Sequence, residues 1–254
     1  MSAVRTWIQL GRNDLRLVLR DRMLLGLLVM VLLMGLGGRY ALPAIDASLA
    51  ANGLLPSEST DLRFRDTFPL FVAFLRVWQV ALLPGTAFGF LLLDEKEDRT
   101  LTALQVTPLP LSRYLRYRVA LPAGFAFVSA LLLGPILGHA PVPWHAALAL
   151  SAGAAVTAPI VTLLLASYAD NKVQGLAYTK FGGVAGLSIL VGFFVDVPWQ
   201  WALGVFPPFL VCKAYWLAAA GESGWGLPLF IGTAVQCGLV VVLLRRFRVI
   251  AFGA

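Results

Sequence analysis

The sequence predicts an all-α polytopic membrane protein with six transmembrane helices. This prediction rests on the amino-acid composition and on the length of the apolar runs. Of the 254 residues, 59% are hydrophobic and only 13% are charged, whereas a soluble domain carries about 25% charged residues. Six apolar runs are long enough, or nearly so, for a helix that crosses the hydrocarbon core in about 20 residues. The runs are uninterrupted, which excludes a β-barrel with its alternating apolar and polar residues.

The six runs make one transmembrane domain over residues 1–254, joined by short connections. The fifth run is the shortest and is rich in glycine. In chain order, the predicted spans are Met23–Tyr40, Val77–Leu93, Val119–Gly138, Ala146–Tyr168, Phe181–Val195 and Gly226–Leu244.

The basic residues predict how the chain is oriented. Fifteen of the 20 Lys and Arg residues lie before the first span, after the last, or in the connections after spans two and four. Because Lys and Arg concentrate on the cytoplasmic side of a membrane, we expect both termini in the cytoplasm. The net charge of +7 then results from topology, and no nucleic-acid partner is expected.

Residues 1–22 have the pattern of an amphipathic helix lying on the membrane surface. Apolar and basic side chains alternate at helical spacing, and Arg5, Trp7, Arg12 and Arg16 are the candidate interfacial residues. The arginines of such a helix bind anionic lipid headgroups while the apolar face enters the interface. A simple topology anchor is an equally good interpretation, and the two roles are compatible.

The connection Ala41–Phe68 contains Pro43, Gly53 and Pro56, which are typical of a loop on the outer side. Arg76 follows near the start of span two. An arginine at the bilayer centre costs about 3 kcal/mol, so we expect its side chain to reach the outer headgroups. An arginine facing a pore is the alternative.

The segment 196–225 is apolar and aromatic, but Pro207 and Pro208 interrupt it. If it crossed the membrane, the basic C-terminal tail would lie outside, against the charge rule. We therefore predict one or two short helices that dip into the outer leaflet as a re-entrant segment. Aromatic side chains favour that interface.

Patterns for catalysis and metal binding are absent. His139 and His145 flank a proline-containing turn with no carboxylate or thiol nearby in the sequence, so we predict a solvated turn rather than a metal site. The two cysteines form no CxxC pair. No phosphate-binding loop, GxSxG elbow or HExxH motif occurs. We expect no catalytic residue, no metal and no cofactor bound by this chain, and hence no enzyme.

The longest charged connection, residues 94–118, is the candidate functional loop. The second span is predicted to continue as a helix into it, with Leu101 and Leu104 on one apolar face beside acidic residues. Such a face needs a packing partner. The candidates are the chain's own inner surface, lipid headgroups, which the acidic residues disfavour, or a groove on a cytoplasmic protein.

The loop reads Glu95-Lys96-Glu97-x-x-Thr100-Leu101-x-x-Leu104-x-x-Thr107-Pro108-Leu109. This pattern resembles the inner loop of ABC-2 type ABC transporter permeases, and is closest in character to the fluoroquinolone-export-like permease subunits. In that family an acidic-Gly-Thr-Leu stretch and a following Thr/Ser-Pro-Leu turn form a coupling helix against a separate ATPase subunit. Arg99 stands where the family usually has glycine. The resemblance implies that the contact residues are Glu95, Glu97, Thr100, Leu101, Leu104, Thr107 and Pro108.

The connection after span four, Ala169–Ala177, is similar to the second inner loop of the same family. Its candidate residues are Asn171 and Lys172, within an Asn-Lys-Val stretch that the fluoroquinolone-export-like subunits share.

The resemblance implies the membrane-spanning subunit of an ATP-driven exporter in a prokaryotic inner membrane. A homodimer, or this chain with a paralogous permease, would form the pathway, and ATP and Mg would bind to the cytoplasmic ABC ATPase subunit. The apolar spans suit an amphiphilic drug, a lipid-linked glycan or a peptide. From the residues alone, an ion-coupled secondary carrier and a membrane-embedded enzyme or assembly factor remain as alternatives.

Overall fold

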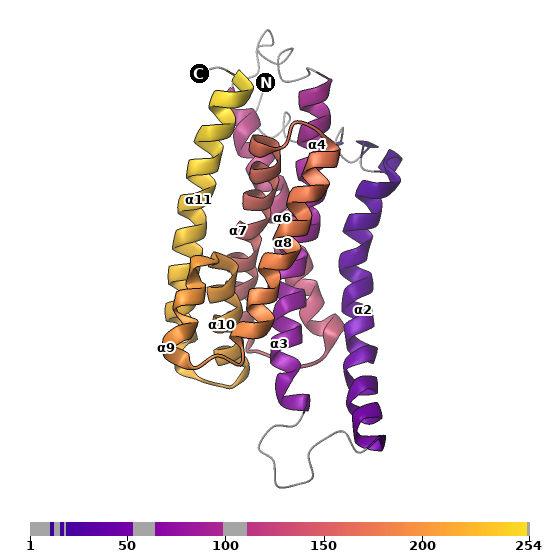
Figure 1. Ribbon diagram of the computed structural model, residues 1–254, viewed down its shortest axis with the longest axis vertical. Coiled ribbons are helices and arrows are strands. Elements are labelled where there is room, and N and C mark those ends of the chain that lie inside the picture. The colour runs from indigo at the N-terminus through magenta and orange to yellow at the C-terminus, as the bar shows by residue number, and fades with distance from the viewer. Residues whose placement is uncertain (1–10, 13–15, 18, 53–63, 99–110, 253–254) are drawn as a thin grey trace.

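The computed structural model describes residues 11–12, 16–17, 19–52, 64–98 and 111–252, which are almost entirely helical and contain no β-strand (Figure 1). Six helices are long and apolar enough to cross a membrane, as predicted. The chain is therefore a multi-pass, all-α membrane protein.

The long elements are α2 (Arg22–Ala51), α4 (Val80–Glu97), α6 (Leu111–Leu137), α7 (Trp144–Tyr168), α8 (Lys172–Gly192) and α11 (Gly226–Phe252). Three short elements lead continuously into α4: η1 (Phe64–Thr67), α3 (Phe68–Ala73) and the π-helical η2 (Phe74–Gln79). Between α8 and α11 lie α9 (Val197–Gln200), η3 (Ala202–Val205), α10 (Pro207–Ala219) and η4 (Ser223–Trp225).

The helices α4 and α7 form the centre of the bundle. About 61% of the most apolar window is buried in each, against 17% in α2. Glycines allow their close approach, because a Cβ at Gly85 would lie 2.7 Å from the Ala158 carbonyl oxygen and one at Gly89 would lie 2.7 Å from Leu165. The Thr162 hydroxyl also donates to the Gly85 carbonyl at 2.9 Å. Small residues thus join two apolar helices by backbone contact.

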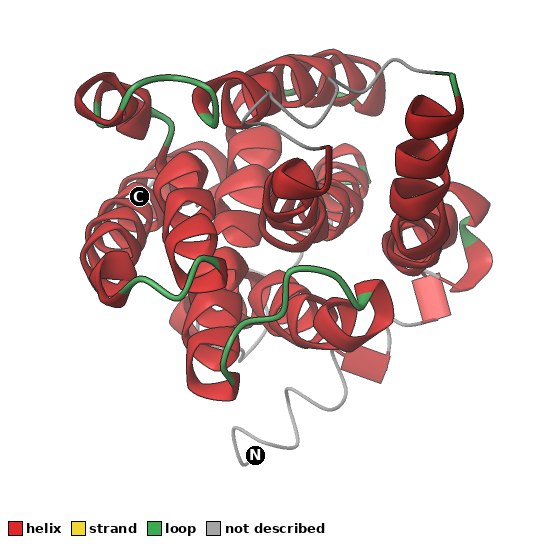
Figure 2. Ribbon diagram, turned by 90° about the horizontal axis from the view of Figure 1, so that it is seen from below, coloured by secondary structure: helices red, strands yellow, loops and turns green. Residues whose placement is uncertain are grey.

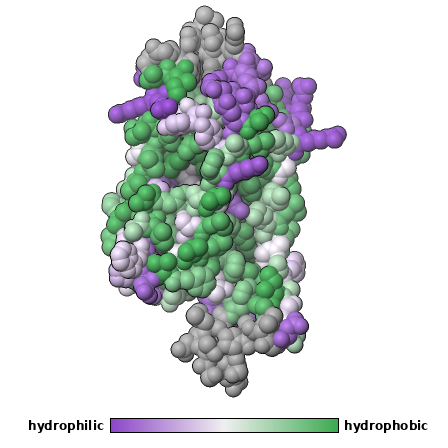
Figure 3. Space-filling view, in the orientation of Figure 1, coloured by the Kyte–Doolittle hydropathy of each residue, from purple (hydrophilic) through white to green (hydrophobic). Residues whose placement is uncertain are grey.

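The two ends of the bundle differ in polarity. Hydrophobic residues cover its middle, and hydrophilic residues gather where α2 begins and α11 ends (Figure 3). We call this the charged end; it carries Asp21, Asp94, Lys172 and Arg246. The opposite end, seen from below in Figure 2, carries the short helices α9 and α10.

The prediction of an outer loop over Ala41–Phe68 is wrong at both ends of that range. The helix α2 continues to Ala51, and helical structure resumes at Phe64. Pro43 lies inside α2 and has no N–H to offer the Arg39 carbonyl. Instead His139 Nε2 lies 3.0 Å from that carbonyl oxygen, so the helix continues without an unpaired acceptor.

In the turn that was predicted to be solvated, His145 is exposed, whereas this contact covers part of His139. His139 is half-buried and stacks edge-on against Phe68, with ring centroids 5.1 Å apart. Among the described residues, no three His, Cys, Asp or Glu side chains come together as a metal site.

The predicted second inner loop is mostly helix. Asn171 caps α8, and its Oδ1 accepts from the Gln174 N–H at 2.9 Å. Gln174 Oε1 in turn accepts from the Asp170 N–H at 2.9 Å. These two hydrogen bonds hold the first turn of α8, which therefore starts at Lys172 rather than at Phe181, so the fifth span is longer than its apolar run.

Arg76 does not reach the headgroups, so this expectation is wrong. Its side chain is 4% exposed, Nε donates to the Ala130 carbonyl at 2.8 Å, and the guanidinium carbon lies 5.6 Å from the centre of the Tyr215 ring. Gly134 provides the space for the guanidinium, because a Cβ at position 134 would lie 3.1 Å from the guanidinium carbon of Arg76. The arginine lies in the π-helical turn η2, a kind of irregularity that frequently marks functional sites.

The segment 196–225 forms short helices as predicted, at the end of the bundle opposite the charged end (Figure 1). Pro207 and Pro208 begin α10 instead of only interrupting the chain, since the first helical positions have no intrahelical N–H bond to lose.

Candidate functional site

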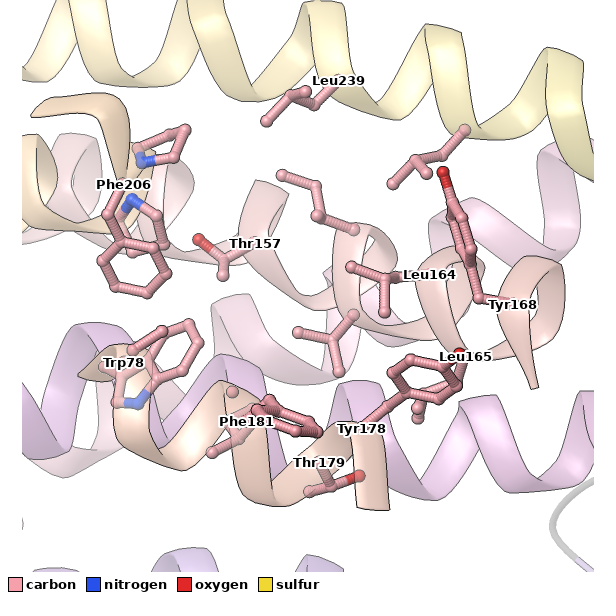
Figure 4. Close-up of a pocket in the computed structure, with 18 of the residues that line it drawn as sticks. Trp78, Thr157, Leu164, Leu165, Tyr168, Tyr178, Thr179, Phe181, Phe206 and Leu239 are labelled. Atoms are coloured by element: carbon pink, nitrogen blue, oxygen red, sulfur yellow. The ribbon is translucent and has the colours of Figure 1, made fainter. Parts of the chain in front are cut away.

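A large apolar groove of about 690 Å³ opens between α7, α8 and α11. In Figure 4 the side chains of Thr157 and Leu164 on α7 lie between Leu239 of α11 and Phe181 of α8. Trp78 and Phe206 close one end of the groove, and Tyr168 and Tyr178 lie toward the other. A groove of this size and lining fits a small apolar or amphiphilic molecule.

Polar groups in and behind the groove are few. The Thr157 hydroxyl donates to Gln236 Oε1 at 3.0 Å, and Gln236 is fully buried on α11. Trp78 packs directly against the backbone of Gly186, because a Cβ at position 186 would lie 2.2 Å from its indole nitrogen. The groove therefore offers mainly apolar contact, with the hydroxyl-bearing residues Thr157 and Thr179 in its lining.

At the charged end, one set of contacts joins the last turn of α4 to the first turns of α6. The Tyr114 hydroxyl donates to Glu95 Oε2 at 2.5 Å, and the Arg118 guanidinium forms an ion pair with Glu95 Oε1. The side chain of Arg118 is 4% exposed and that of Glu95 is 13% exposed. We call these three residues the α4–α6 clamp. It joins the two chain positions that flank residues 99–110.

A second set of ion pairs centres on Lys172, the first residue of α8. Its Nζ lies 2.9 Å from Asp94 Oδ1 on α4 and 3.4 Å from Asp21 Oδ2 at the start of α2. We call these three residues the Lys172 bridge. Beside it, Lys96 Nζ pairs with Asp170 Oδ1 at 3.3 Å. The bridge and the clamp together link the starts or ends of α2, α4, α6 and α8.

Asp21 also caps α2, since its Oδ1 accepts from the N–H groups of Met23 and Leu24. Burial disfavours its charged form, but these two backbone hydrogen bonds and Lys172 outweigh burial and lower the pKa of the Asp21 carboxyl. The carboxylate thus serves both the helix and the bridge.

The predicted site residues fall into three groups. Glu95 and Lys172 lie in the clamp and the bridge, Asn171 caps α8, and Glu97 is exposed at the end of α4. Arg12 and Arg16 are helical and exposed. The remaining candidates lie outside the described residues: Arg5, Trp7, Thr100, Leu101, Leu104, Thr107 and Pro108.

Four residues of the clamp and the bridge were not predicted from the sequence: Asp21, Asp94, Tyr114 and Arg118. The spacing of Tyr114 and Arg118, four apart in a helix that also carries apolar residues, places both on one face and was a usable signal. No signal in the sequence pairs Asp21 with Lys172, which are 151 positions apart.

A family model described as "Fluoroquinolones export permease protein Rv2686c-like" matches residues 14–244, which include the groove, the clamp and the bridge. The chain belongs to this family. The match confirms the resemblance drawn from the inner loop, to ABC-2 type permeases and in particular to fluoroquinolone-export-like subunits.

Two curated relatives in this permease family come from strains of Mycobacterium tuberculosis. They are the fluoroquinolones export permease proteins MT2760, of strain CDC 1551 / Oshkosh, and Rv2686c, of strain ATCC 25618 / H37Rv. Each is 32% identical over 98% of this chain and 96% of its own length. No solved structure matches the chain. This export permease therefore shares nearly its whole length with its named relatives.

Proposed function

We propose that this permease is the membrane-spanning subunit of an ATP-driven exporter. A separate cytoplasmic ATPase subunit would bind ATP and Mg and dock on residues 94–118, on the side where the charge rule places both termini. A second permease, identical or paralogous, would complete the pathway in the inner membrane of a prokaryotic cell. The substrate would be an amphiphile, of which the fluoroquinolones in the relatives' names are one kind.

The observation that carries the proposal is the α4–α6 clamp. Its three side chains fasten α4 to α6 on either side of residues 99–110, where the resemblance places the coupling helix. A force applied to that segment would therefore move α4 and α6 together. A stiff connection of this kind is what a rigid-body transition requires.

The Lys172 bridge extends the same connection to α8 and α2. Since α8 forms one wall of the apolar groove, movement of its first turn would change the width of the groove. In this scheme Glu95 and Lys172 position helices, and Glu97 and Leu101 contact the ATPase subunit.

Co-purification of the ATPase subunit tests the proposal. Leu101→Asp would put a carboxylate into an apolar groove of the partner, where burial without a hydrogen-bond donor is costly. We expect wild-type permease to retain an ATPase subunit in detergent and Leu101→Asp to lose it, together with substrate efflux, at equal membrane expression. Leu101→Met, which keeps the apolar contact, is the matched control and should behave as wild type. Efflux by Leu101→Asp at the wild-type rate would refute the proposed coupling.

A further inference from the structure

A second cavity, of about 520 Å³, lies at the end of the bundle opposite the charged end. It shares no lining residue with the apolar groove, and it is lined by residues of α9 and α10 together with residues of η1, α3, η4, the start of α11 and the connections between them. Three of its lining residues are aromatic: Phe193, Trp201 and Trp216. The cavity also contains a basic side chain, Lys213 of α10.

Lys213 is buried without an acceptor. Its side chain is 5% exposed, and its Nζ has no hydrogen-bond partner among the described residues. The contact that remains is with an aromatic face, since Nζ lies 4.5 Å from the centre of the Trp201 ring. Asp66 and Glu222 also line the cavity, but neither forms an ion pair with Lys213. An ammonium group carries three donors, and leaving them unpaired away from water is unfavourable.

The indole N–H of Trp216, on the same face of α10, is a second buried donor without an acceptor among the described residues. Trp216 follows Lys213 by three positions, so both side chains lie on one side of α10. Two of the residues that line this cavity therefore carry a buried donor without an acceptor among the described residues, and this indicates a missing acceptor, because buried polar groups in proteins are nearly always hydrogen-bonded.

The surroundings place this cavity at the level of lipid headgroups. Trp144 and Trp199, at the same end of the bundle, are 75% and 71% exposed, and Trp201 is 40% exposed. Tryptophan is enriched at the membrane–water interface, where its amphipathic ring is favoured. An amphiphile in the membrane presents its polar group at this depth.

We propose that this cavity binds the anionic headgroup of an amphiphile, a phosphate or a carboxylate. The Lys213 ammonium and the Trp216 indole N–H supply the hydrogen bonds, and the aromatic wall takes the adjoining apolar part. Two sources share this chemistry: an anionic phospholipid and a small aromatic carboxylate. Binding here needs no ATPase subunit, so its test is independent of the proposed function.

Equilibrium binding of 1-pyrenebutyrate to purified permease in a neutral detergent tests the site. We expect Lys213→Met to weaken binding about tenfold or more, which corresponds to the loss of one charge-assisted hydrogen bond. The alcohol 1-pyrenebutanol, which lacks the charge, should bind wild type and variant equally. Lys180→Met, at an exposed lysine on α8, is the matched control and should bind the acid as wild type does.

A second experiment tests whether the ligand is an anionic phospholipid. The permease is purified from membranes that contain phosphatidylglycerol and phosphatidylethanolamine, and the phospholipids that co-purify with it are extracted and identified. Phosphatidylglycerol retained by wild type and lost from Lys213→Met would identify the headgroup as a phosphate. Loss of 1-pyrenebutyrate binding alone would identify a carboxylate ligand. Equal binding of the acid and equal retained lipid in both proteins would overturn the proposal.

Trp216→Phe is a second, milder variant that keeps the ring and removes only the N–H. We expect it to weaken binding of the acid about threefold, within the range for one neutral hydrogen bond. The melting temperature of Lys213→Met without ligand separates binding from structure. It should equal or exceed that of wild type, because the variant removes an unpaired buried charge. A lower melting temperature would assign Lys213 a structural role and overturn the proposal.

Discussion

The two ends of the bundle bury basic side chains in different ways. At the charged end Arg118, 4% exposed, pairs with Glu95 across the α4–α6 clamp. At the opposite end Arg76 and Lys213 are buried to a similar degree, yet neither has a carboxylate partner among the described residues. The ion pair of Arg118 holds two helices together, whereas Lys213, which has no acceptor among the described residues, is available for a ligand, so the two ends are suited to different tasks.

The largest expected effect separates the two buried arginines. Arg118→Met removes the guanidinium that pairs with the mostly buried Glu95 carboxylate, and should lower the free energy of unfolding by about 3 kcal/mol. Arg76→Met removes a charge that has no carboxylate partner among the described residues and lies against the Ala130 carbonyl and Tyr215, and should change the free energy of unfolding by less than about 1 kcal/mol. Reversible unfolding in mixed micelles measures both.

A double-mutant cycle tests whether the pair itself is responsible. Arg118→Met combined with Glu95→Gln should lose clearly less stability than the two single changes added together, because both charges are then absent. Additive losses would show that Arg118 stabilises the helices by packing alone, and the contrast with Arg76 would disappear.

A smaller effect is expected at the Lys172 bridge. The side chain of Lys172 is about one-third exposed, at 33%, and those of Asp94 and Asp21 are similar. Partly exposed ion pairs contribute up to about 1 kcal/mol and are screened by salt. We expect Lys172→Met to lower the melting temperature slightly in low salt and less in 1 M salt, a condition in which the screening length is about 3 Å. Lys180→Met should show neither effect, and an equal loss at both salt concentrations would contradict an electrostatic bridge.

The smallest expected effect concerns pH. The pKa of Asp21 is lowered in the folded chain, so its carboxylate stabilises the fold at pH above its unfolded value. That contribution is lost as pH falls through the folded pKa, below about 4. The difference in melting temperature between wild type and Asp21→Asn should therefore be constant from pH 7 to 5 and shrink toward pH 3. A difference that grew on acidification would have the wrong sign.

The sequence predicted the membrane helices well because apolar runs reflect a single strong force, exclusion from water. Helix ends were predicted less well. The apolar window stops at Tyr40, yet α2 continues to Ala51 because Leu, Ala and Ile favour helix and a distant histidine meets the carbonyl that Pro43 leaves free. Contacts between residues 100 positions apart leave no local pattern.

Of the six residues in the clamp and the bridge, only two were predicted from the sequence. Glu95 and Lys172 follow from the motif, but their partners depend on how the helices pack. For Arg76 the prediction itself was wrong. The general cost of burying an arginine predicted an exposed side chain, but Gly134 provides the space and the Ala130 carbonyl provides an acceptor inside the bundle. Composition predicts where the membrane lies, whereas single polar residues depend on tertiary contacts.

The polar contacts of α2 also set its rotation. Asp21 meets Lys172 at one end, and Arg39 Nη1 donates to the Ile136 carbonyl at 3.1 Å at the other. Eighteen residues separate the two, which is five helical turns at about 3.6 residues each and spans about 27 Å. Both anchors therefore point to the same side, and the distance between them is close to the thickness of a hydrocarbon core, about 30 Å. One residue inserted between them would turn one anchor by about 100° relative to the other, so α2 can keep both contacts only in its present register.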